Sequence, residues 1–98
     1  MTKDLLEQYP DICGELMDLE KSGRFPKRRE KLSRQKAQIE AFVDSIEDSR
    51  VRRIVTLRAM EGLTWQQVAG RMGYRVSLSN ARRLYSEEVK KFLEISTF

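Results

Sequence analysis

The segment "GLTWQQVAGRMGYRVSLSNARRLY", Gly62 to Tyr85, contains the clearest signals for the fold of this chain. Thr64 has the position of a helix N-cap, and Gln67 follows three residues later, which is the pattern of a capping box. Gly73 ends a helix of about two turns, and a longer helix begins near Ser77 or Ser79. A short capped helix, a turn and a longer basic helix are the outline of a helix-turn-helix, although helix pairs of this outline also occur in proteins that never bind DNA.

The last helix, predicted over residues 78–95, has two different faces when its residues are placed at about 100° per residue. Its core side holds Leu78, Ala81, Tyr85, Val89 and Phe92, with Leu84 at the edge. Its opposite side carries Ser79, Arg83, Ser86 and Lys90, with Asn80 and Glu87 beside them. Arginine pairs well with guanine and asparagine with adenine, so the exposed start of this helix suits the major groove. The alternative is an ordinary solvated face.

Two apolar stripes precede this region. Leu5, Tyr9, Ile12, Leu16 and Leu19 recur at steps of three and four residues, and Pro10 predicts that the helix either begins or bends there. A second stripe, within a helix over about residues 27–45, comprises Leu32, Ile39, Phe42, Val43 and Ile46. A short "SGRFPK" connection favours an antiparallel hairpin over residues 1–46. The same stripes could instead pair between two chains.

A third helix begins near Asp48 or Ser49, either of which can act as N-cap, and continues to Met60. Gly62 then ends it. Val68, Ala69 and Met72 supply the inward face of the short helix that follows, and Trp65 is predicted to be a core residue. Arg52 and Arg53 are interpreted as solvated charges. The sequence therefore predicts an all-α chain with a helical hairpin (residues 1–46) followed by a three-helix unit (residues 47–98).

Composition supports this fold class and argues against several functions. The chain has 98 residues, 35% of them charged, with two prolines, no histidine and one cysteine, Cys13. Such a composition favours helices. No apolar run approaches the roughly eighteen residues of a membrane span, and the first residues do not resemble a signal peptide. Without histidine, a second cysteine or a glycine-rich phosphate loop, we expect no enzyme, no metal site and no cofactor.

Charge is divided unevenly along the chain. Residues 1–22 hold two lysines and six acidic residues, so their net charge is −4, whereas the remainder has 17 basic and nine acidic residues, a net charge of +8. Within it, "RFPKRREKLSRQK" (Arg24 to Lys36) carries seven positive charges and one negative charge. This density either attracts a polyanion or belongs to a solvated helix face.

The segment "IEDSRVRRIVTLRAMEGLTWQQVAGRMGY" resembles the helix-turn-helix of the fourth domain of bacterial sigma factors, and more closely the small sigma-region-four-like regulators of phages and prophages. The resemblance covers about residues 46–93. It rests on four features in the order that such motifs have: a helix that ends at Gly62, a helix start at Thr64, the inward Val68-Ala69 pair and a turn at Gly73. One departure is the turn "YRVSLSN": Ala81 lies eight residues beyond Gly73, where sigma-type motifs use about six. The longer turn could lift Arg75 toward the DNA backbone or keep the helix from base contacts.

The resemblance implies a sequence-preferring DNA-binding regulator in the cytoplasm of a bacterial host, associated with the nucleoid. Its partner would be double-stranded DNA. Its acidic first helix would hold either a second copy, through residues 5–19 and 32–46, or host RNA polymerase. The alternative function is a helical protein-interaction module, such as a polymerase adaptor or a packaging subunit. We expect base contacts from Ser79, Asn80 and Arg83. Backbone contacts are expected from Thr64, Gln66, Arg71, Arg75, Ser77, Arg82, Lys90, Lys27, Arg28 and Arg29.

Overall fold

The described part of the chain is helical throughout its regular structure and contains no strand. The computed structural model describes the backbone of residues 3–95 and the side chains of residues 4–91. Its elements are α1 (Lys3–Glu7), α2 (Tyr9–Ser22), α3 (Pro26–Ser45), α4 (Ser49–Val55), the π-helical segment η1 (Thr56–Met60), α5 (Trp65–Arg71) and α6 (Leu78–Ile95). The predicted all-α fold class is confirmed.

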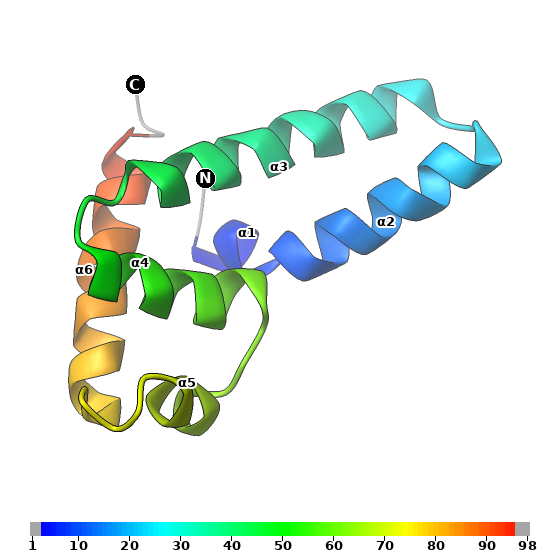
Figure 1. The fold of residues 1–98 in the computed structure, drawn as a ribbon. Coiled ribbons are helices and arrows are strands. Elements are labelled where there is room, and N and C mark those ends of the chain that lie inside the picture. The colour runs from blue at the N-terminus through cyan, green and yellow to red at the C-terminus, as the bar shows by residue number, and fades with distance from the viewer. Residues whose placement is uncertain (1–2, 96–98) are drawn as a thin grey trace.

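Helices α2 and α3 form an antiparallel hairpin that projects from the rest of the molecule (Figure 1). Pro10 lies in the first turn of α2, and a break at Gln8 separates α2 from the short α1. Leu16 and Leu19 of α2 are buried, as are Leu32 and Ile39 of α3. The two apolar stripes thus pack on each other within the chain, which is one of the two arrangements that the sequence left open. The projecting hairpin gives the molecule extents of 45 × 30 × 19 Å.

Helix α4 begins where the sequence predicts, because the side chain of Asp48 accepts hydrogen bonds from the amides of Arg50 (2.8 Å) and Val51 (3.3 Å). Its continuation differs from a regular α-helix. The amide of Glu61 donates to the carbonyl of Thr56 at 3.0 Å, five residues back, which defines the π-helical turn η1. The predicted third helix therefore does reach Met60, but in two geometries.

Helix α1 joins the hairpin to the C-terminal half. Leu6 is fully buried, and α1 packs on η1. The hydroxyl of Tyr85 in α6 donates to the carboxylate of Glu7 at 3.1 Å. Buried apolar residues from Leu6 to Val89 form one continuous cluster. The hairpin and the helices α4 to α6 consequently share one core, which extends along the hairpin as far as Leu19 and Leu32, while the connection around Gly23 to Phe25 is exposed.

Candidate nucleic-acid interface

Helix α5 has the capping box that the sequence predicts. The hydroxyl of Thr64 accepts from the amide of Gln67 at 3.2 Å, and the Gln67 side chain accepts from the amide of Thr64 at 2.9 Å. Val68 and Ala69 face the core, whereas Gln66 is exposed. These reciprocal bonds satisfy two amides that a helix start would otherwise leave unpaired, so the orientation of α5 is fixed at its exposed end.

The turn from α5 to α6 contains two successive residues with positive φ, Gly73 (69°) and Tyr74 (56°). The amide of Tyr74 donates to the carbonyl of Ala69 at 3.0 Å, and Val76 is inserted into the core with 5% of its surface exposed. Ser77 then accepts from the amide of Asn80 at 3.2 Å. The longer turn is therefore anchored by Val76. The sequence offered one signal for this anchor, a lone aliphatic residue in a polar turn.

The two predicted faces of α6 are present in the structure. Ala81, Tyr85 and Val89 are buried, and Leu78 and Leu84 are half-buried. Phe92, predicted for the same face, lies outside the residues whose side chains are described. The exposed residues at the start of the helix are Ser79, Asn80, Arg82 and Arg83. Small polar, amide and guanidinium groups therefore reach solvent from the first two turns of α6.

A cluster of aromatic and charged side chains packs against the buried face of α6. The rings of Trp65 and Tyr85 meet edge to face with centroids 5.2 Å apart, and the Arg58 guanidinium lies 4.8 Å from the centre of the Trp65 ring. Arg58 Nε also lies 3.6 Å from a carboxylate oxygen of Glu7. Burial raises the pKa of Tyr85 well above its ordinary value, and the neighbouring Glu7 carboxylate raises it further. Trp65 packs against the core, as the sequence predicts.

Arg83, a predicted base-contacting residue, is paired in the structure with Glu87 one turn later, at 3.1 Å. Both side chains are largely exposed, at 61% and 55%. An exposed ion pair of this spacing contributes about 0.3 to 0.5 kcal/mol. The pair thus holds Arg83 only weakly, and a stronger acceptor can take its place.

The structure divides the predicted contact residues between two places. Those on α5, the turn and the start of α6 are exposed on consecutive segments: Thr64, Gln66, Arg71, Arg75, Ser77, Ser79, Asn80, Arg82 and Arg83. Lys90 is also exposed but lies seven residues beyond Arg83, about 10 Å along the helix. Lys27, Arg28 and Arg29 occupy the first turn of α3, at the opposite end of the molecule (Figure 1). The basic hairpin end is therefore not part of the surface formed by α5 and α6.

Two arginines of α4 make hydrogen bonds that the sequence did not predict. Arg52 donates to the carbonyl of Ile46 at 2.9 Å, and Arg53 donates to the carbonyl of Arg71 at 2.9 Å. Arg53 is exposed, as its interpretation as a solvated charge expects, whereas Arg52 is half-buried; each guanidinium also donates a hydrogen bond to a backbone carbonyl at a helix end. Periodicity could not indicate this, since the bond of Arg53 joins residues 18 positions apart.

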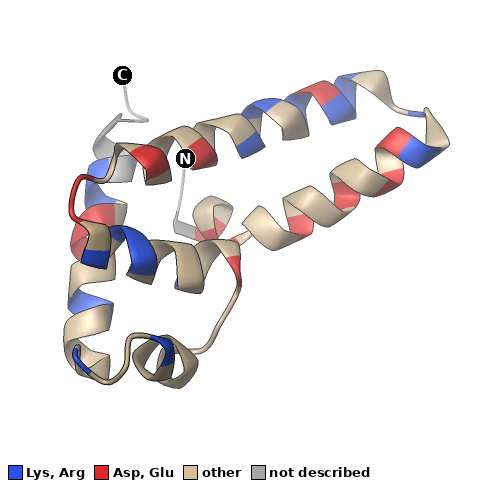
Figure 2. Cartoon of the chain, in the orientation of Figure 1, with Lys and Arg blue, Asp and Glu red and all other residues tan. Residues whose placement is uncertain are grey.

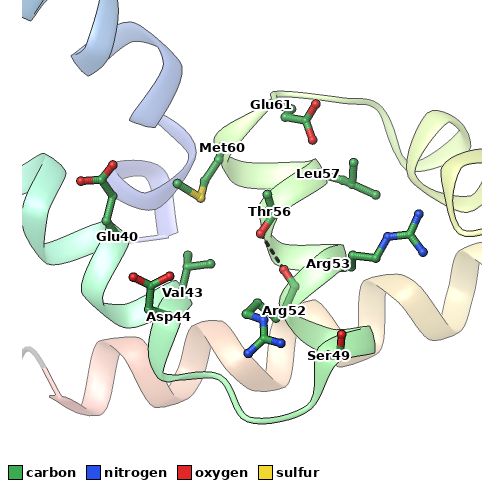
Figure 3. Close-up of a pocket in the computed structure, with 10 residues that line it drawn as sticks. All are labelled: Glu40, Val43, Asp44, Ser49, Arg52, Arg53, Thr56, Leu57, Met60 and Glu61. Atoms are coloured by element: carbon green, nitrogen blue, oxygen red, sulfur yellow. Dashed lines mark hydrogen bonds between the residues drawn. The ribbon is translucent and has the colours of Figure 1, made fainter.

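A hollow of about 700 Å³ lies between α3 and the α4–η1 helix (Figure 3). It is lined by acidic and basic side chains together with the apolar groups of Val43, Leu57 and Met60. The Thr56 hydroxyl is occupied in a 2.8 Å bond to the carbonyl of Arg52.

Comparisons with protein-family models, with curated proteins and with solved structures gave no match to this chain. In the described residues, no helix combines the length and the apolar character needed to cross a membrane.

Proposed function

We propose that this chain is a sequence-preferring DNA-binding regulator of the phage or prophage type, in which α5, the turn and α6 act as a sigma-region-four-like helix-turn-helix. The observation that carries the proposal is the division of α6. Ala81 and Tyr85 attach the helix to the core, and its opposite side presents polar groups that hydrogen-bond to base edges. In this proposal α6 enters the major groove and α5 crosses the DNA backbone.

Base contacts are assigned to Ser79, Asn80 and Arg83, which lie in the first two turns of α6. Arg83 would exchange Glu87 for the acceptor pair of guanine, and Asn80 would pair with adenine. The phosphate contacts of this surface would come from seven residues: Thr64, Gln66, Arg71, Arg75, Ser77, Arg82 and Lys90.

The basic end of the hairpin would add affinity without specificity. Lys27 and Arg28 are exposed, and Arg28 lies over the Phe25 ring at 4.7 Å. Because they lie opposite α6, these residues and Arg29 would contact DNA outside the site that α6 enters.

The proposal also includes partners. The acidic α2 would hold either host RNA polymerase or a second copy of the chain in the bacterial cytoplasm. Dimerisation through residues 5–19 and 32–46 would require the hairpin to open, since its stripes are buried against each other. Specific DNA sites are commonly read by dimers, which makes the oligomeric state on DNA part of the proposal.

The proposal is tested by fluorescence anisotropy on duplexes selected from a random library, across a salt series. The variants are Arg83→Ala, Glu87→Gln and the control Lys91→Ala, which removes another α6 ion pair, with Glu88. We expect Arg83→Ala to lose about 1 to 3 kcal/mol of discrimination between selected and random duplexes. Glu87→Gln should strengthen binding because it releases Arg83. Weak binding without sequence preference, unchanged in Arg83→Ala, would refute the proposal.

A second candidate function is a protein-interaction module. It is favoured by the projecting hairpin, where Met17 and Phe25 are 59% and 53% exposed. Under this alternative the chain would bind a protein through α2 and would show weak DNA contact without sequence preference. Met17→Ser would weaken the protein complex, whereas Arg83→Ala would leave it intact.

A further inference from the structure

A basic pocket of about 440 Å³ lies between the start of α4 and the turn that joins α5 to α6. Four arginines line it: Arg50 and Arg53 from α4, Arg71 at the end of α5, and Arg75 in the turn. The hydroxyl-bearing Ser49 and the backbone at Gly73 complete the wall. We call it the four-arginine pocket. Neither Arg50 nor Arg53 belongs to the contact residues proposed above.

No carboxylate lines this pocket. The nearest acidic residues in sequence, Glu47 and Asp48, line a different hollow together with Glu88, and Asp48 is occupied as the cap of α4. Within the described part of the chain, no ion pair involves Arg50, Arg71 or Arg75. Four positive charges around one hollow repel each other unless an anion lies between them. This arrangement favours an anionic ligand.

The pocket is partly preorganised. Arg53 donates to the carbonyl of Arg71 at 2.9 Å, which ties α4 to the end of α5. Figure 3 shows the Arg53 side chain extending away from Glu40 and Asp44, the acidic residues on the far side of α4. The adjoining turn is fixed by the buried Val76. A ligand would therefore meet one guanidinium already held in position and three exposed ones free to close on it.

We propose that the four-arginine pocket binds a phosphate group. Guanidinium groups bind phosphate oxygens through paired, charge-assisted hydrogen bonds, and four arginines line this one pocket. The phosphate comes either from the DNA backbone beside the site that α6 enters or from a free polyphosphate. The DNA source rests on the proposed function, whereas the phosphate chemistry of the pocket does not.

The pocket itself is tested with inorganic tripolyphosphate, followed by amide NMR on the full chain at low salt. The pocket variant Arg50→Gln/Arg75→Gln is compared with Arg24→Gln/Arg34→Gln, which removes two exposed arginines from the hairpin. We expect saturable shifts at residues 49–53 and 73–76, and binding about tenfold weaker in the pocket variant, as for lost bonds between charged groups. The hairpin variant should match the unsubstituted chain. Equal binding by both variants, or shifts spread evenly over all basic segments, overturns the proposal.

The two sources are distinguished by the salt dependence of DNA binding. If the phosphate belongs to DNA, the slope of log affinity against log salt is smaller in the pocket variant by about 0.9 per lost contact. The pocket variant then keeps its sequence preference. Tripolyphosphate competes with DNA for the unsubstituted chain. If the ligand is a free polyphosphate, Arg50→Gln alone, which leaves the proposed backbone contact of Arg75 in place, binds DNA like the unsubstituted chain. A chain that shows no sequence preference refutes the proposed function but leaves the tripolyphosphate result standing, so the two failures are distinguishable.

Discussion

The α2–α3 hairpin and the unit formed by α4 to α6 are both built from helices with one buried face, yet they are stabilised differently. In the hairpin, two helices meet along one line, and neither has a side-chain N-cap bond. In the C-terminal unit, three helices close around Ile54, Val68 and Tyr85, which have no exposed surface, and both α4 and α5 have side-chain caps. Three helices enclose these side chains on several sides, whereas a pair of helices buries only the faces that meet.

The two regions also differ in where their charged residues lie (Figure 2). Acidic residues follow α2 and basic residues gather on the outer half of α3, so the hairpin presents opposite charges on its two helices. In the C-terminal unit, basic residues lie on α4, at the end of α5, in the turn and on α6. The two regions therefore differ in how their charges are distributed: the hairpin separates acidic and basic residues onto different helices, whereas α6 carries both signs.

The largest effect is expected from Tyr85→Ala. Tyr85 contacts Trp65 and donates a hydrogen bond to Glu7 at the centre of the unit formed by α4 to α6. The free energy of unfolding should fall by about 3 to 5 kcal/mol, as for other large buried aromatic residues. Urea denaturation followed by circular dichroism measures it. Tyr85→Phe is the matched control, since it keeps the ring and removes only the hydroxyl. A loss below about 1 kcal/mol in the alanine variant would contradict the central role of this residue.

A smaller effect is expected from Leu19→Ala in the hairpin. Leu19 is 6% exposed near the connection between α2 and α3, where neighbouring side chains can relax, so we expect a loss of about 2 to 3 kcal/mol, the low end of the leucine-to-alanine range. Hydrogen exchange should accelerate in the last turns of α2 and the first turns of α3, with little change in α6. Equal acceleration in α6 would show that the two regions unfold as one unit.

Thr64→Ala should cost about 1 kcal/mol, because it removes half of the capping box of α5. The same denaturation experiment measures it. Gln8→Ala at the N-cap position of α2 is the matched control in the hairpin. It should have almost no effect, since Gln8 makes no side-chain cap bond. Similar losses of unfolding free energy in Thr64→Ala and Gln8→Ala would show that side-chain caps do not distinguish the C-terminal unit from the hairpin.

The smallest effect concerns pH. Burial and the Glu7 carboxylate raise the pKa of Tyr85 in the folded chain, so its neutral form is favoured by folding. This stabilisation is complete below the unfolded tyrosine pKa of about 10 and decreases as pH rises above it. Unfolding free energies at about pH 8 and about pH 11 should differ less in Tyr85→Phe than in the unsubstituted chain. If the unfolding free energy falls equally at high pH in Tyr85→Phe and in the unsubstituted chain, the loss belongs to other groups. One of them is Tyr9, whose pKa is also raised by burial and by its hydrogen bond to Glu40.

Local features of the chain were predictable because they depend on residues a few positions apart. The caps at Asp48 and Thr64 and the start of α2 at Pro10 follow from side chains that reach their own backbone. The buried face of α6 follows from its helical period. For the candidate interface, the exposure of Ser79, Asn80 and Arg83 was predictable on the same grounds, but the ion pair of Arg83 with Glu87 was not anticipated.

Local patterns thus predict an all-helical chain, most of its helix limits and the apolar face of each helix, since a period of 3.6 residues and a cap are local properties. The tertiary fold closes the two stripes within the chain and brings Tyr85 to Glu7 across 78 positions. It also decided that the basic end of the hairpin lies away from α6, and that Arg50 and Arg53 join Arg71 and Arg75 around one pocket. These arrangements depend on the turns and on packing between remote segments, which no local pattern specifies.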